Sequence, residues 1–262
     1  MALSAKPADP GAPIPAASCS SASASVTAPG ATAAGAASLA GLLLLADSRL
    51  PAGGHVHSGG VEALVDRGLL RDVDDLAAVL DARIRTAGLV AAAFAAVGAL
   101  RPPDWPTWDV AIDVRTPSPA LREASRAQGV ALLRTAGAAW PADPALTALR
   151  AVARRPHHPL VLGAAAAAAG ATPTQAAALA VHHLVGGAAS AAVRLLGLNP
   201  LTAAGVQAAL APLSDRVSDQ ACAAATEAVA ADDPDLLPSD ATPLPEILAE
   251  LHDASEVTLF AS

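Results

Sequence analysis

The residues best suited to chemistry lie between Leu42 and Gly68, in the stretch "LLLLADSRLPAGGHVHSGGVEALVDRG". His55 and His57 form an H-x-H pair, which can offer two imidazole nitrogens to a metal ion when the chain is extended. A catalytic metal needs about three protein ligands, and no carboxylate or cysteine stands at a helical spacing that supplies the third. Two interpretations stay open. Either these histidines cap, pack or hydrogen-bond, or they handle nickel or copper transiently with imidazoles from other helices.

The other candidates for catalysis lack the context that their chemistry requires. The pairs His157–His158 and His182–His183 are adjacent residues, and neighbours on a helix point about 100° apart, so neither pair alone chelates on one face. Ser58 has no glycine two residues before it and therefore no nucleophile elbow. The only lysine, Lys6, cannot form a Walker A loop. A hydrolase would need a nucleophile and a base within reach, and the sequence shows no such pair. We expect no catalysis, no bound cofactor and no resident metal.

Charge is distributed unevenly along the chain. Up to Arg216 there are 16 basic and 14 acidic residues, and beyond it there are 10 acidic and no basic residues, which gives the total of −8. The main body offers no basic stripe for phosphate contacts, so we expect no nucleic-acid partner. Arg194 is the only arginine between Arg155 and Arg216. It either snorkels outward along its helix or binds a partner.

The elements that position these residues are predicted to be helices. Alanine dominates, tyrosine is absent, and no segment alternates with period 2 over a useful length. Residues 1–37 are rich in Ala, Ser, Pro and Gly without an apolar period, which predicts a disordered tail. Residues 38–262 are then predicted to form one all-α bundle of about ten helices. The expected ranges are 39–50, 60–67, 72–100, 118–140, 144–154, 159–170, 173–196, 200–211, 213–231 and 243–253.

Several helix boundaries follow from local chemistry. Asp72 or Asp74 suits the start of the third helix, and the prolines of "RPPDWPTWD" forbid its continuation. Its core stripe is predicted to include Leu76, Val79, Leu80, Ile84, Ala87, Ala91, Phe94 and Val97. Thr172, Pro173 and Gln175 form a capping box. The apolar runs 87–100 and 159–170 are shorter than the roughly 20 residues that span a membrane. With no secretory signal visible, the cytoplasm is the expected location.

Five segments in order resemble the urease accessory protein UreF family over about residues 39–262. The first is "LADSRLPAGGHVHSGGVEALVDRGLL", where Ser48, Leu50, Pro51, Gly53, Ser58, Gly60 and Glu62 fit the opening signature and Val61 replaces leucine. The second and third are "LREASRAQGVALL" and "HHPLVLGAAAAAAG". The fourth is "SAAVRLLGL", and the fifth is the closing "HDASEVTLFAS", in which Thr258 stands where the family usually has arginine. The glycines of the first segment suggest a shaped interhelical loop, with Ser58 or Glu62 capping the next helix.

The resemblance implies a dimeric accessory protein without catalytic turnover. Such a protein binds UreD (also called UreH), recruits the GTPase UreG, regulates the GTPase step and helps deliver nickel to the urease apoprotein. The residues expected to contact partners are Pro51, Gly53, Ser58, Glu62, Arg194, Leu259 and Phe260. Leu259 and Phe260 either insert in a partner groove or fold back on their own bundle. The alternative function is a small helical nickel-binding protein that uses the His55/His57 loop.

Overall fold

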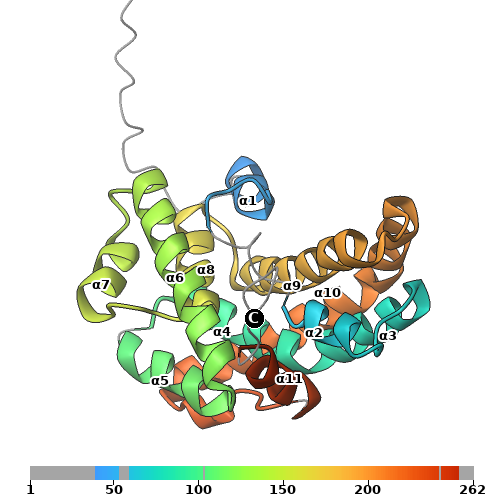
Figure 1. The fold of residues 1–262 in the computed structure, drawn as a ribbon. Coiled ribbons are helices and arrows are strands. Elements are labelled where there is room, and N and C mark those ends of the chain that lie inside the picture. Colours follow the sequence, from blue (N-terminus) through green and yellow to red (C-terminus); the bar gives the residue numbers. More distant parts are fainter. Residues whose placement is uncertain (1–38, 53–58, 103, 242, 254–262) are drawn as a thin grey trace, which may run out of the picture. The chain divides into compact units, whose positions relative to one another are not determined.

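A computed structural model describes residues 39–52, 59–102, 104–241 and 243–253 (Figure 1). Within them the fold is all-α, as the sequence predicts. The predicted tail 1–37 and the site residues Gly53, His55, His57, Ser58, Leu259 and Phe260 lie outside the described residues. The α-helices are α1 (Leu39–Ala46), α2 (Val61–Asp66), α3 (Val73–Arg83), α4 (Leu89–Leu100), α5 (Trp105–Arg115), α6 (Pro119–Ala139), α7 (Pro144–Val152), α8 (His158–Ala168), α9 (Pro173–Leu196), α10 (Pro200–Ala231) and α11 (Pro243–Asp253). A π-helical turn, η2 (Ile84–Gly88), joins α3 to α4, and a 3-10 turn, η3 (Pro234–Leu236), follows α10.

Helix α4 is the centre of the core and packs against α8, α9 and α10. The backbones of α4 and α8 lie close together, and glycine makes this possible. A Cβ atom on Gly163 would overlap the carbonyl oxygen of Ala95, and one on Gly98 would overlap that of Leu160. Helices α6 and α7 pack on α8, whereas α2 and α3 pack on α9 (Figure 1). The described core thus consists of closely spaced helices packed mainly through alanine and leucine, with few aromatic side chains.

The predicted helix starts are confirmed by their caps. The side chain of Asp72 accepts hydrogen bonds from the backbone N–H groups of Asp74 and Asp75. Ser118 caps α6 and Asn199 caps α10. Both halves of the predicted capping box at the start of α9 are present. These side chains satisfy N–H groups that a helix leaves without an internal partner.

The observed helices differ from the expected ones at two segments that contain proline. Helix α10 runs without a break from Pro200 to Ala231 with Pro212 inside it, where two helices were expected. Tertiary packing therefore overrides the tendency of proline to end a helix. The preceding helix ends before "RPPDWPTWD" as expected, but the segment "WPTWDVAIDVR" forms α5, a helix that is not among the expected ranges. Its Pro106 lies in the first turn, where the missing N–H costs nothing.

The buried stripe predicted for the helix at 72–100 is confirmed except near its middle, at Ala87. Leu76, Leu80, Ile84, Phe94 and Val97 are buried, and Val79 and Ala91 are partly buried, but Ala87 is exposed. The π-helical turn η2 lies between the two halves and accommodates one extra residue. The extra residue shifts the buried face of α4 relative to that of α3. A single 3.6-residue period therefore cannot predict the buried residues on both sides of η2. With η2 included, α3 and α4 form one continuous helix from Val73 to Leu100.

Two helices, Val73–Leu100 and Pro173–Leu196, are long and apolar enough to span a membrane. The expected run 159–170 lies in the shorter helix α8, whereas the run 87–100 is the end of the first of these two long helices. The share of the apolar window buried inside the fold is 61% for the first helix and 56% for the second. A core helix of a soluble protein also has this length and composition, so the two helices are weak support for a membrane location.

Candidate functional site

The first signature segment connects α1 to α2, and the structure describes both of its ends. Pro51 is exposed, and its carbonyl oxygen accepts a 2.7 Å hydrogen bond from Thr135 Oγ1 on α6. Gly59 and Gly60 have φ angles of 61° and 84°. Glycine adopts such angles without the strain that a side chain causes, so the end of the loop depends on glycine at these two positions.

Glu62 does not cap α2, which corrects one of the two caps predicted for this helix. The N-cap is Gly60, and within the described residues no side-chain hydrogen bond caps this helix. Glu62 is buried in the first turn, and its Oε2 lies 3.4 Å from Nε2 of His252 on α11. A carboxylate removed from water needs a polar partner. This contact therefore ties the first signature segment to the last described helix.

Helix α11 is also attached to the start of α6 through two glutamates. Glu246 Oε2 accepts a 2.7 Å hydrogen bond from the backbone N–H of Ser118, and Glu250 Oε1 accepts one of 2.9 Å from that of Ala120. The Ser118 hydroxyl also donates to Glu250. Carboxylates are stabilised at this end of a helix by its free N–H groups and by its dipole. The hydrogen bond from Ser118 lowers the pKa of Glu250, whereas burial raises the pKa of Glu246.

Helix α11 presents an apolar stripe on its exposed face. Leu244, Ile247 and Leu251, which we call the α11 stripe, are 49%, 56% and 49% exposed. Their spacing of three and four residues places them on one face of the helix. Residues 254–262, which contain the predicted anchors Leu259 and Phe260, follow this helix directly.

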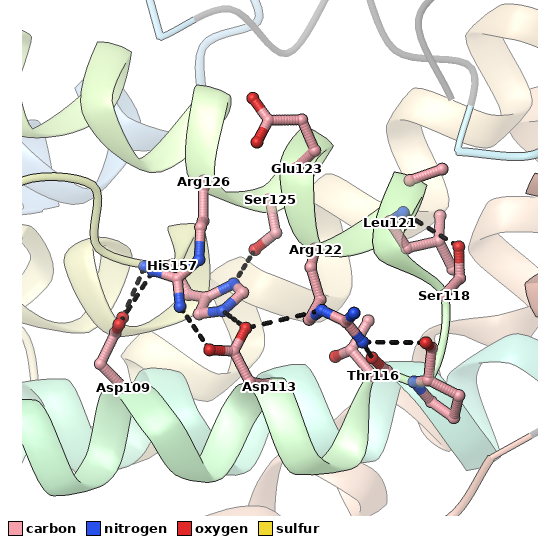
Figure 2. Close-up of polar contacts among 12 residues, drawn as sticks. Asp109, Asp113, Thr116, Ser118, Leu121, Arg122, Glu123, Ser125, Arg126 and His157 are labelled. Carbon is pink, nitrogen blue, oxygen red and sulfur yellow. Dashed lines mark hydrogen bonds and ion pairs between the residues drawn. The ribbon is translucent and has the colours of Figure 1, made fainter. Parts of the chain in front are cut away.

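A polar cluster joins α5, α6 and α8 (Figure 2). We call it the His157 cluster: Asp109, Asp113, Ser125, Arg126 and His157. The His157 side chain has no exposed surface. Its Nε2 lies 2.9 Å from Asp113 Oδ1, and its Nδ1 lies 3.0 Å from Ser125 Oγ. The backbone N–H of His157 donates a 2.8 Å hydrogen bond to Asp109 Oδ1.

Arg126 completes the His157 cluster by pairing with both aspartates. Its Nη1 lies 2.9 Å from Asp109 Oδ2, and its Nη2 lies 2.7 Å from Asp113 Oδ2. Two carboxylates and one guanidinium thus share a partly buried site, where a missing partner would leave a costly charge. The planar fork of arginine presents separate N–H groups to the two carboxylates in a fixed geometry, which the single ammonium of lysine does not provide.

The protonation states in the cluster follow from burial and hydrogen bonding. Burial lowers the pKa of His157, against the opposing effect of its hydrogen bond to Asp113. Burial would raise the pKa of Asp113, but hydrogen bonds from His157 and Arg126 outweigh it and lower that pKa. At neutral pH the imidazole is therefore neutral and the carboxylate is charged. In that state Nε2–H donates to Asp113, and Nδ1 accepts from the hydroxyl of Ser125.

Ser125, His157 and Asp113 are linked by hydrogen bonds in the same way as the nucleophile, the base and the orienting carboxylate of a catalytic triad. The sequence revealed no such set, so the structure corrects that expectation. The ring of His157, however, is fully buried, and the chain packs closely beside Ser125, which is itself partly exposed. A Cβ on Gly129 would overlap the carbonyl oxygen of Pro156, so α6 lies in direct backbone contact with the chain beside Ser125. The Ser125 hydroxyl also lies 3.3 Å from the backbone N–H of His158. We interpret the cluster as a structural contact between helices, because the base His157 is fully buried and backbone packs beside Ser125, where a substrate would have to bind.

The aspartates of this cluster were missed because α5 was missed. A signal for the helix is present: Trp105, Trp108 and Ile112 are spaced by three and four residues, and all three are buried. Asp109 and Asp113 then lie four residues apart on one face. The prolines at 102, 103 and 106 favoured the interpretation that this segment is not helical.

Among the residues that the structure describes, the other histidines singled out in the sequence do not assemble into a metal site. The imidazole rings of His158 and His182 each lie 6.0 Å from that of His183, measured between centroids. The Nε2 of His183 lies 2.9 Å from the carbonyl oxygen of Leu45. No group of three or more His, Cys, Asp or Glu residues in the described part of the chain is placed to hold a metal. Arg194 lies exposed in the last turn of α9.

Comparison with known proteins agrees with the resemblance seen in the sequence. Residues 70–211 match the family model UreF. A urease accessory protein UreF from Mycobacterium sp. (strain JLS) is 45% identical over 222 residues, which cover 84% of this chain and 97% of the relative. The corresponding proteins of Mycolicibacterium vanbaalenii and Mycobacterium tuberculosis are 43% and 38% identical, each over 86% of this chain and 99% of the relative. The chain therefore belongs to the UreF family of urease accessory proteins.

Proposed function

We propose that this protein acts in the maturation of urease by binding other proteins. In this proposal it forms a homodimer in the cytoplasm and binds UreD (UreH), the GTPase UreG and the urease apoprotein. It serves as a scaffold for insertion of the nickel centre and regulates the GTPase step. It has no catalytic turnover of its own and holds no resident cofactor, and nickel is the cargo of the assembled complex.

The observation that carries this proposal is the α11 stripe. Three large apolar side chains on one face of a helix remain about half exposed although the carboxylates of Glu62, Glu246 and Glu250 hold α11 to α2 and α6. An amphipathic helix with an uncovered apolar face is a common means of protein recognition. A fixed helix with such a face supports a role in partner binding, and we assign this face to UreD.

The residues after α11 extend the same proposal. Val257, Leu259 and Phe260 follow a polar segment and would add apolar anchors to the α11 stripe. We expect deletion of residues 257–262 to leave the melting temperature nearly unchanged and to weaken capture of UreD. Equal capture of UreD by the truncated and full-length chains would contradict this assignment. Pro51 and Arg194, both exposed, are proposed as further partner contacts.

Co-expression tests the function as a whole. The tagged full-length chain is expressed with untagged UreD, UreG and urease subunits, and we expect all of them to co-purify with it. Deletion of its gene should abolish urease activity in cells supplied with nickel, and expression of the chain should restore that activity. A chain that captures no maturation partner, or that the cell does not need for active urease, contradicts the proposal.

Nickel titration separates the scaffold from the alternative nickel-binding protein. Calorimetry on the full-length chain should detect no micromolar nickel site. Micromolar binding that is lost in the double variant His55→Ala, His57→Ala would instead support a chain that handles nickel itself.

A further inference from the structure

An open cleft between α6 and α7 is lined by three arginines. The cleft has a volume of about 490 Å³, and Arg134, Arg150 and Arg154 contribute to its walls. All three are exposed. None of them has an ion pair or side-chain hydrogen bond to any residue in the part of the chain that the structure describes.

The surroundings of the cleft do not neutralise this charge. A second cleft of about 390 Å³ adjoins the first through Ala153 and Arg154. Its other two arginines are paired, Arg155 with Glu123 and Arg126 with Asp109 and Asp113. Residues 101–155 contain eight arginines and five acidic residues, a net charge of 8 − 5 = +3 in a chain of net charge −8. The positive charge is therefore local and concentrated at the first cleft.

Gly137 shapes this cleft. A Cβ on residue 137 would overlap Nη2 of Arg150, so the absence of a side chain lets the guanidinium lie against α6. Val130 and Leu133 supply apolar surface beside it. Guanidinium groups bind carboxylates through paired hydrogen bonds, and apolar surface between them favours a peptide over a simple ion.

We propose that the α6–α7 cleft, defined by Arg134, Arg150, Arg154 and Gly137, binds an acidic segment of a urease maturation partner. Complementary charge supports this proposal, because three guanidinium groups that form no ion pair with any described residue line the cleft beside an apolar surface. This inference rests on the proposed function, which supplies the set of possible partners. A nucleic acid fits poorly, because three arginines are few for phosphate contacts and the rest of the chain repels a polyanion.

The test uses the full-length chain and fluorescent 15-residue peptides tiled across UreD, UreG and the urease subunits. Fluorescence anisotropy at 50 mM and 300 mM NaCl measures their affinity. We expect at least one acidic tile to bind, and to bind more weakly at the higher salt concentration. The variant R134Q/R150Q/R154Q should bind that tile at least about tenfold more weakly, because three partly exposed ion pairs are lost. The same tile with Gln and Asn in place of its acidic residues should not bind.

Two variants control for charge and for folding. The variant R71Q/R85Q/R216Q removes the same three charges elsewhere: Arg71 and Arg85 form surface pairs with Asp75 and Asp81, and Arg216 is exposed. It should bind the tile like the wild type. Gly137→Ala displaces the end of a flexible side chain, so it should weaken binding without lowering the melting temperature.

Three results would overturn the proposal: binding by no acidic tile, equal losses in both triple variants, or tighter binding of a 20-base oligonucleotide than of any acidic tile. Co-expression distinguishes this failure from failure of the proposed function. If the wild type captures UreD and UreG and R134Q/R150Q/R154Q captures them equally, only the cleft assignment is wrong. If the wild type captures neither, the proposed function is wrong.

Discussion

At the scale of residues, the His157 cluster is the most constrained polar feature of the described chain. His157→Ala leaves Ser125 and Asp113 short of a partner and creates a cavity, so we expect a loss of about 2–4 kcal/mol in the free energy of unfolding. Urea denaturation at pH 7.5 measures it. His182→Ala is the control: His182 is exposed on α9, and its removal should change the stability by less than about 0.5 kcal/mol. Equal effects would show that the cluster does not stabilise the fold.

The same histidine predicts a pH dependence. Burial lowers the pKa of His157 below its ordinary value of 6.5, so the unfolded chain takes up a proton at a higher pH than the folded chain does. Its contribution is complete above pH 6.5 and is lost as the pH falls toward the lowered value, by at most about 1.4 kcal/mol per pH unit. Burial lowers the pKa of His183 as well, which acts in the same direction. The lowered pKa of Asp113 affects the pH dependence of stability only below about pH 3.8.

Denaturation of the wild type and of His157→Ala between pH 7.5 and pH 5.5 isolates the contribution of His157 to the pH dependence of stability. We expect the wild type to lose stability over this interval and the variant to lose less. Parallel pH profiles would contradict the assignment of a neutral, buried imidazole to His157.

At the scale of elements, the contact between α4 and α8 depends on glycine. Gly163→Ala pushes a Cβ into the backbone of Ala95, and we expect it to destabilise the fold by about 3 kcal/mol. Gly205→Ala is the control in α10, where the added Cβ meets open space; it should stabilise the fold by about 0.5–1 kcal/mol. Thermal denaturation compares the two variants. A neutral Gly163→Ala would mean that α4 and α8 are more widely separated than described.

The continuous helix α10 makes a second prediction at this scale. Pro212 lies in its interior and is exposed, so it removes one backbone hydrogen bond. Pro212→Ala should raise the stability by about 1–3 kcal/mol, whereas Pro200→Ala in the first turn should have little effect. If Pro212→Ala lowers the melting temperature, the chain breaks at this point as its sequence alone suggests.

These elements show what sequence patterns can and cannot predict here. The capping box at Thr172 and the cap at Ser118 are local signals, so α9 and α6 could be predicted closely. Helix α5 and the unbroken α10 could not, because prolines dominate the local pattern and the packing that overrides them is tertiary. The His157 cluster needed both α5 and the contact of α6 with α8, which no spacing within one helix reveals. The close approach of Gly129 to Pro156 and the pairing of Glu62 with His252 are likewise contacts between segments that are distant in the sequence.

At the scale of the whole molecule, the described chain presents surfaces for binding more clearly than a centre for chemistry. Its polar groups with lowered or raised pKa values mostly hold helices together, as in the His157 cluster and at Glu246 and Glu250. Its exposed features differ in kind: an apolar stripe on α11 and a basic cleft between α6 and α7. Two surfaces of different chemistry suit a protein that brings different partners together.

Capture of UreD by two single variants tests the central claim most directly. Ile247→Asp places a charge in the middle of the α11 stripe, and Val114→Asp places one on α5, where Val114 is 74% exposed. Both positions are open to solvent, so both variants should melt within a few degrees of the wild type. We predict that Ile247→Asp captures at least about tenfold less co-expressed UreD, and that Val114→Asp captures as much as the wild type. Equal capture by Ile247→Asp and the wild type would contradict the assignment of α11 as the partner-binding surface.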